Sequence, residues 1–298
     1  MIYATLGRSL RAGRGAALLC AALCVTLAGQ GSWTAAWATT GEGVPLAPHR
    51  AVYELTLSAT RSGAGVSSVA GRMVYDLVGS PCEGYTQTMR FVTRMVNQSG
   101  SSTVSDLRST TWEDAVGKRF RFDSSQYRDD KSTEATAGDA ARLGATEGIK
   151  VDLTKPAKRS ISLPAGAYFP IQHTMALIQA ARGGKSSFRA DLYDGSEKGE
   201  KVYDTVSALG RTQAAGGNRK LPEVTGSDRL NAVPAWPVSI AYFEPRSDSV
   251  DALPVYEISF LMFENGVSRK LHIDYGDFAL EGDLMEIAFH EPSKCEQK

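Results

Sequence analysis

The chain has 298 residues, of which 33 are Lys or Arg and 33 are Asp or Glu, so its formal net charge is zero with histidine neutral. Hydrophobic residues make up 42% of the chain, and there are four cysteines. No basic stripe or arginine-rich block occurs, which disfavours nucleic acid as a partner.

Residues 1–38 carry the features of a secretory signal. Their only charged side chains are three arginines near the N-terminus, and an apolar run of 12 residues follows at 16–27. Ala36-Trp37-Ala38 then provides the small-x-small pattern of a cleavage site. The run is too short to cross a bilayer. We therefore expect export with cleavage after Ala38; an uncleaved anchor helix is the alternative.

Cleavage would leave one mature domain, residues 39–298, in the periplasm. Loss of the leader arginines leaves 30 basic and 33 acidic residues, a net charge of −3. The leader cysteines, Cys20 and Cys24, each follow Leu and not the small residue of a lipoprotein signal. Cys82 and Cys295 remain, and exported chains with two cysteines usually pair them. Two independent buried thiols are the alternative.

The mature chain continues, from residue 49 on, with stretches in which apolar and polar residues alternate. The first strand carries Ala51, Tyr53 and Leu55 on one side. Residues 129–148 are poor in large apolar side chains, so we interpret them as edge strands plus a loop. The other strands predicted before residue 165 are 69–77, 85–95, 103–112, 118–127, 149–153 and 160–163.

A single helix of about 13 residues is predicted after this run of strands. Pro170 suits a first helical position, and Gly183-Gly184 can supply a left-handed stop after Arg182. The broad apolar face of the helix must pack on the sheet. The predicted contacts with the sheet or its groove are Phe169, Ile171, Met175 and Ile178.

The remaining chain predicts strands at 187–193, 201–209 and 234–243, followed by a meander from 256 to 289. Asn265-Gly266 favours a type I′ hairpin turn, and Gly282-Asp283 is interpreted as a further turn. The whole pattern predicts a mainly-β fold of 12–14 antiparallel strands with one amphipathic helix. No alternation of strands and helices typical of a parallel sheet occurs.

No catalytic constellation emerges from the sequence. The nucleophile elbow, the zinc-protease helix, the Walker loop and the dinucleotide fingerprint are all absent. His272 and Asp274 share a strand face, but a solvated face is the simpler interpretation than a metal site. His49 and Arg50 form a candidate surface polar site for a carboxylate or phosphate. We predict neither enzymatic activity nor a cofactor.

Several stretches together resemble the EipB-like cell envelope integrity proteins of alphaproteobacteria. They are Pro48-His49-Arg50-Ala51-x-Tyr53-x-Leu55, Tyr168-Phe169-Pro170-x-x-His173, Leu192-Tyr193-Asp194-Gly195, Tyr256-Glu257 and Glu264-Asn265-Gly266-x-x-Arg269-x-Leu271-x-x-Asp274-Tyr275. The resemblance implies a soluble periplasmic protein with a broken β-spiral of about fourteen strands, in two half-barrel-like sheets with a helix against them. It also implies a disulfide between Cys82 and Cys295, and support of the envelope under cell-wall or detergent stress.

The predicted function is that of a non-enzymatic factor that maintains cell envelope integrity. A curved open sheet has a concave apolar face, which could bind an envelope lipid, a lipoprotein or another periplasmic protein. The helix could instead fill that face as core. An outer-membrane β-barrel and an envelope hydrolase are the alternatives. The terminal Glu296-Gln297-Lys298, which lacks an aromatic residue, argues against the barrel.

Overall fold

The computed structural model describes residues 44–295, except 145, 218, 220 and 245–252. All of them lie in one compact unit of the chain, Glu42–Lys298. The predicted leader, residues 1–38, falls outside the described residues.

Strands dominate the described part of the chain. The elements in chain order are β1 (His49–Thr60), β2 (Val66–Ser80), β3 (Gly84–Asn97), β4 (Ser102–Glu113), β5 (Arg119–Arg128), β6 (Lys131–Gly144), β7 (Gly148–Lys155), β8 (Arg159–Leu163), α1 (Pro170–Arg182), β9 (Ser187–Leu192), η1 (Glu197–Gly199), β10 (Tyr203–Leu209), η2 (Ser227–Ala232), β11 (Ala235–Phe243), β12 (Tyr256–Phe263), β13 (Ser268–Asp274) and β14 (Phe278–Phe289).

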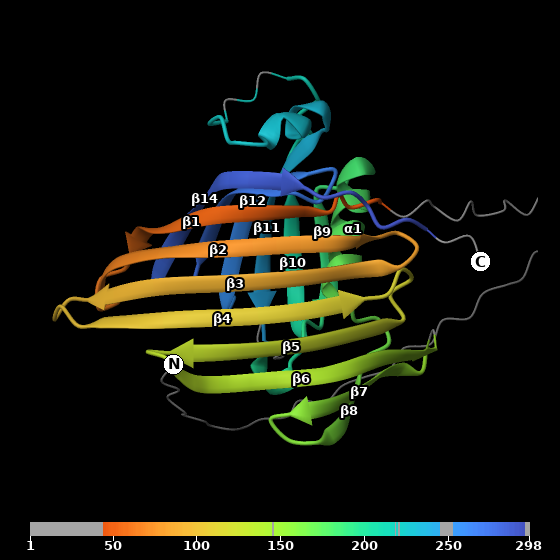
Figure 1. The fold of residues 1–298 in the computed structure, drawn as a ribbon, viewed down its shortest axis with the longest axis horizontal. Helices are drawn as coiled ribbons and strands as arrows, with labels where there is room; N and C mark the ends of the chain where they lie inside the picture. The colour runs from red at the N-terminus through yellow and green to blue at the C-terminus, as the bar shows by residue number, and fades with distance from the viewer. Residues whose placement is uncertain (1–43, 145, 218, 220, 245–252, 296–298) are drawn as a thin grey trace, which may run out of the picture. The chain divides into compact units, whose positions relative to one another are not determined.

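These strands form one antiparallel sheet of fourteen, in the order β8-β7-β6-β5-β4-β3-β2-β1-β14-β13-β12-β11-β10-β9 (Figure 1). The predicted mainly-β, antiparallel and open fold is thus confirmed. The sheet does not close into a barrel, because β8 and β9 are its edges. The resemblance implied two half-barrel-like sheets, but pairing of β1 with β14 joins both halves of the chain into one.

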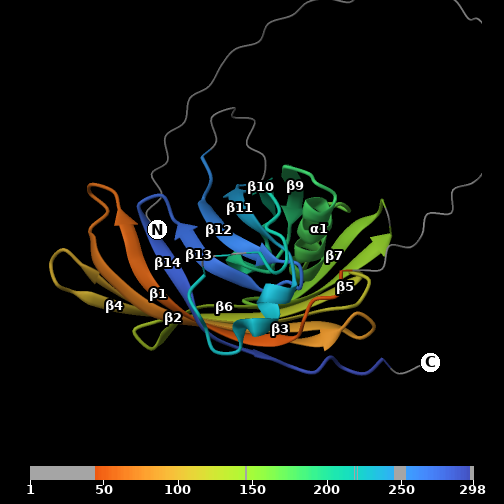
Figure 2. The same cartoon turned by 90° about the horizontal axis from the view of Figure 1, so that it is seen from above.

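The sheet is strongly curved, and α1 lies within the curve (Figure 2). The predicted helix is confirmed at Pro170–Arg182. Its buried Leu177 and Ile178 belong to one hydrophobic cluster with Leu77 of β2 and Trp236 of β11. Strands far apart in the sheet order therefore bury their inner faces against the same helix, which stabilises the curvature.

The N-terminus of α1 is capped from a distant strand. Phe169 at the N-cap offers no side-chain hydrogen bond. Glu113, at the end of β4, accepts the N–H groups of Ile171 (2.8 Å) and Gln172 (2.9 Å) with its two carboxylate oxygens. Two donors that a helix leaves unpaired at its start are thereby satisfied.

The interpretation of residues 129–148 as edge strands plus a loop is wrong. Most of the segment forms β6, which is 14 residues long and pairs with β5 and β7. Its small residues suit its position, because the inner face lies under a large ring. A Cβ on Gly138 would come within 2.9 Å of the Phe122 ring.

Two predicted turns in the last meander need correction. The hairpin between β12 and β13 forms, but only Gly266 of the Asn265-Gly266 pair has a positive φ, at 86°. The turn is therefore not type I′. Gly282-Asp283 is no turn, because β14 continues through it. A Cβ on Gly282 would meet Leu271 at 3.0 Å and Leu55 at 3.1 Å, so close strand packing requires glycine here.

Candidate ligand-binding groove

The concave side of the sheet contains two adjoining cavities. The helix-side cavity, of about 290 Å³, lies between α1 and strands of both halves of the sheet. The tyrosine-side groove, of about 730 Å³, extends away from the helix along the inner faces of β2–β5 and β12–β14. Met73, Met89, Ile258 and Ile273 line both, so together they form one concave groove.

The apolar lining follows from the alternation of the strands. In β3, Met89, Phe91 and Met95 face the groove. The intervening Thr88 and Arg90 line a hollow on the outer face. Because successive strand residues point to opposite sides, a period-two sequence gives one apolar and one polar surface. Met73 and Met89, at the junction where the two cavities adjoin, add flexible side chains that adapt to ligands of different shapes.

The four predicted helix contacts occupy different places. Ile171 lines the helix-side cavity. Met175 packs partly buried against the core cluster that contains the fully buried Ile178. Phe169 lies in a separate cluster, with its ring centroid 5.0 Å from that of Phe120. The helix therefore fills only part of the concave side.

Two buried histidines border the helix-side cavity. His173 donates from Nε2 to Thr205 Oγ1 (3.2 Å), whose own hydroxyl donates to the Ala190 carbonyl (2.7 Å). Burial lowers the pKa of His173 to about 4, so it is neutral at neutral pH. His49 lies 1% exposed, with Nδ1 2.7 Å from the Ala47 carbonyl, and burial lowers its pKa as well.

The predicted surface polar site of His49 and Arg50 is wrong. His49 faces the concave groove, whereas Arg50 is exposed on the outer face and lies 3.7 Å from Asp76. Adjacent residues of a strand point in opposite directions, so the two side chains cannot meet one ligand. The two residues are adjacent in the sequence, and this suggested a shared site that the geometry of the strand excludes.

The tyrosine-side groove has one acidic group on its wall. Asp194 and Ser196 come from the turn after β9 and line the groove beside Tyr203 and Tyr256. The sequence did not indicate this site, because Asp194 falls in the connection between two predicted strands, 187–193 and 201–209. The methionines at the junction could have been found from the alternation of β2 and β3.

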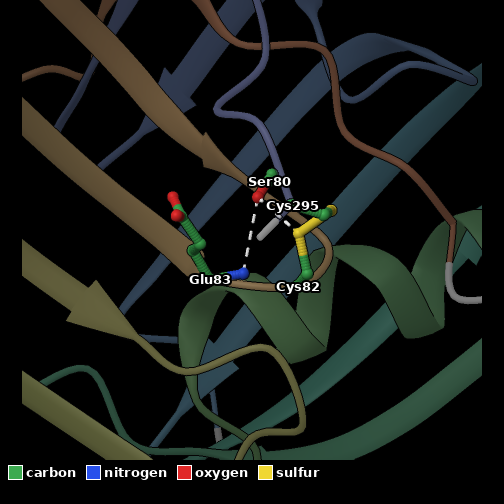
Figure 3. The surroundings of a disulfide bond; sticks show 4 residues. All are labelled: Ser80, Cys82, Glu83 and Cys295. Atoms are coloured by element: carbon green, nitrogen blue, oxygen red, sulfur yellow. Dashed lines mark hydrogen bonds between the residues drawn. A yellow bond between two sulfur atoms is a disulfide. The ribbon is translucent and has the colours of Figure 1, made fainter. Parts of the chain in front are cut away.

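Cys82 and Cys295 form a disulfide, with their Cα atoms 5.8 Å apart (Figure 3). It links the turn after β2 to the tail that follows β14. Ser80, 1% exposed, places its hydroxyl 3.1 Å from Cys82 Sγ and accepts the N–H of Glu83 (3.4 Å). The hydrogen bond from the Glu83 N–H to the Ser80 hydroxyl thus stabilises the turn that carries Cys82.

No group of three or more His, Cys, Asp or Glu side chains in the part of the chain that the structure describes is arranged to hold a metal ion. None of its helices is long and apolar enough to cross a bilayer.

Comparison with known proteins gives consistent results. The model of the EipB-like family matches residues 40–291. The cell envelope integrity protein EipB of Brucella abortus (strain 2308) is 37% identical over 257 residues, which are 86% of this chain and 89% of that protein. A solved beta-barrel-like protein of a domain of unknown function, also from Brucella abortus, has a TM-score of 0.74 at 36% identity and covers 83% of this chain and 99% of its own. The chain belongs to the EipB-like family.

Proposed function

We propose that the chain is an exported, non-enzymatic factor that maintains envelope integrity by holding the acyl chain of an envelope lipid in the concave groove. The relative's name supports the envelope role, and the leader at residues 1–38 supports export. The observation that supports a lipid ligand is the groove itself, which is continuous, mostly apolar and only partly filled by α1.

The free energy available is adequate for an acyl chain. Burial of each CH₂ group contributes about 0.8 kcal/mol, and ordering the chain and its binding partners opposes this gain. Ten buried methylenes contribute about 8 kcal/mol, which equals the free energy of micromolar binding before these costs, so micromolar affinity needs a longer acyl chain. A longer apolar segment of a protein would need its backbone hydrogen bonds satisfied inside the groove, which favours the lipid.

The outer face of the sheet argues against the alternative of an outer-membrane barrel. Asp106 lies 2.9 Å from Arg90 and 2.7 Å from Arg108, and these two guanidinium groups lower its pKa to about 2. On β5 and β6, Arg121 and Asp139 form another exposed pair at 2.9 Å. A membrane barrel needs an apolar band on this side.

An envelope hydrolase is the other alternative, and measured turnover of an envelope substrate would support it. It would need an acid and a base within reach of one substrate atom. Loss of a measured activity on replacing a single His or Asp, with the fold intact, would overturn the non-enzymatic proposal.

Met89→Trp is expected to weaken binding of an apolar probe such as N-phenyl-1-naphthylamine by at least about tenfold, because the larger ring occupies the junction of the two cavities. Fluorescence titration measures the dissociation constant. Thr88→Trp is the matched control: the same ring, one residue earlier, lies on the outer face and should leave binding unchanged. Equal weakening by both variants would contradict a binding site inside the groove.

Export is expected to yield a mature protein that begins at residue 39 and is released by osmotic shock of the producing cells. N-terminal sequencing and fractionation measure the two properties. Retention of residues 1–38 in the membrane fraction would support the anchor helix instead.

A further inference from the structure

Asp194 is held at the wall of the tyrosine-side groove by a tight turn. Its Oδ1 accepts the N–H of Ser196 at 2.9 Å. Gly195 between them has φ 75°, and a Cβ there would lie 2.5 Å from the ring of Phe122. The turn is thus fixed onto the core beneath it, and its carboxylate has little freedom to turn away from the groove.

Three tyrosine rings pack against one another beside the groove that Asp194 lines. Tyr242 and Tyr256 stack with centroids 4.3 Å apart, and Tyr203 packs edge-on against them at 5.8 and 5.9 Å. Burial raises the pKa values of these three phenols most, and the nearby charge of Asp194 raises them further. Tyr203 and Tyr256 line the same groove as Asp194.

Asp194 forms no ion pair within 4.0 Å in the described part of the chain. The charge of Lys201 acts on Asp194 and opposes the effect of burial on its pKa. However, Lys201 Nζ is bound to Glu244 (2.7 Å) and lies over the Tyr203 ring (4.7 Å). Burial raises the pKa of Asp194, and an additional cation bound beside the carboxylate would lower that pKa.

We propose that the Asp194 end of the groove binds the ammonium group of an amine-bearing lipid, whose acyl chain lies along the methionine junction. This inference rests on the function proposed above. Aromatic faces and a carboxylate attract an ammonium group together, by cation–π and charge-assisted hydrogen-bond interactions. An anionic head group would meet the Asp194 carboxylate unfavourably, whereas Arg128 of β5, which also lines the groove, would attract it. Tightest binding of dodecyl sulfate in the series below would therefore assign the head group to Arg128 and overturn the proposal.

A head-group series tests the proposal on the full mature chain. Dodecylammonium, dodecanol and dodecyl sulfate, each below its micelle concentration, compete with bound N-phenyl-1-naphthylamine. The unmodified chain should bind dodecylammonium roughly tenfold more tightly than dodecanol, with dodecyl sulfate weakest. Equal affinity for dodecylammonium and dodecanol would overturn the head-group proposal and leave the acyl-chain site standing. Failure of the probe and of all three competitors to bind would overturn both.

Asp194→Asn should remove the roughly tenfold preference and leave dodecanol binding unchanged. Its amide oxygen can still accept the Ser196 N–H, so the turn is kept. Asp139→Asn, which removes a carboxylate from the outer face, is the control and should retain the preference. Preference retained in a folded Asp194→Asn protein would contradict the assignment. The head-group series stands by itself if that variant does not fold.

One further competitor separates a lipid amine from a protein amine. N-acetyl-lysine amide carries the ammonium group without an acyl chain and should compete at least about 100-fold more weakly than dodecylammonium, since the buried methylenes are lost. Comparable competition would assign the amine to a protein partner and overturn the lipid.

Discussion

Replacing Cys82 and Cys295 together by serine is expected to lower the free energy of unfolding by roughly 5 kcal/mol. The bond closes a loop of 213 residues, and on the chain-entropy account a longer loop restricts the unfolded chain more. Urea unfolding of the oxidised protein and of the double variant measures the difference. A loss of this size is comparable with the whole stability of many domains.

The folded sheet itself should survive the loss of the bond. β14 pairs with β1 and β13 independently of the disulfide. Beyond β14, the N–H of His290 donates to the Pro48 carbonyl at 2.9 Å, and that of Ser293 donates to Gly79 at 3.4 Å. Reductant should therefore lower the unfolding midpoint of the unmodified protein and leave that of the double variant unchanged. A midpoint that stays the same in reductant for both would show that the bond adds nothing.

Local patterns predicted the helix and most strands because their determinants are local. Pro170 fixes the backbone at the start of α1, and Gly184, with φ 70°, ends it. The apolar spacing between them specifies one buried face. What caps the first turn could not be predicted, since Glu113 is 58 residues away from Ile171 in the sequence.

The predicted position of a strand in the sheet is wrong where pairing with strands distant in the sequence determines it. Proline inside a strand usually marks an edge or a bulge, yet Pro237 belongs to β11, which lies between β10 and β12. Pairing with β10 ends at Val238, and the Pro237 carbonyl accepts the N–H of Gly210. Pro237, which has no N–H, therefore lies just beyond the last residue pair between β10 and β11, where no hydrogen bond from its nitrogen is needed. No local signal distinguishes that position from an edge.

The concave groove was predictable as a surface but not in its chemistry. Alternation in β2 and β3 is enough to place Met73 and Met89 on the inner face. The acidic group could not be placed from the sequence, because Asp194 and Tyr256 come from distant segments and line one groove only in the folded sheet. Prediction from sequence therefore reached the shape of the groove and missed its charge.

The cap that Glu113 provides should contribute strongly to stability. Glu113→Ala would leave the N–H groups of Ile171 and Gln172 without an acceptor in a buried place, and we expect a loss of roughly 3 kcal/mol in the free energy of unfolding. Glu54→Ala, on the exposed outer face of β1, is the control and should change stability by less than about 0.5 kcal/mol. Equal effects of the two variants would contradict the capping role.

Glu113 should also make stability depend on pH, with a sign that follows from its environment. Burial raises its pKa from 4.5 to about 8, although the two N–H bonds partly oppose this. The folded carboxyl thus holds a proton that the unfolded one has released. Its contribution is fully present below pH 4.5 and is lost as the pH rises through about 8. Glu113→Gln cannot titrate, so urea unfolding between pH 5 and 8 should show the stability difference between the unmodified protein and this variant shrinking as pH rises. A difference that stays constant over this range would mean that the carboxylate is ionised throughout, held so by the helix N-terminus.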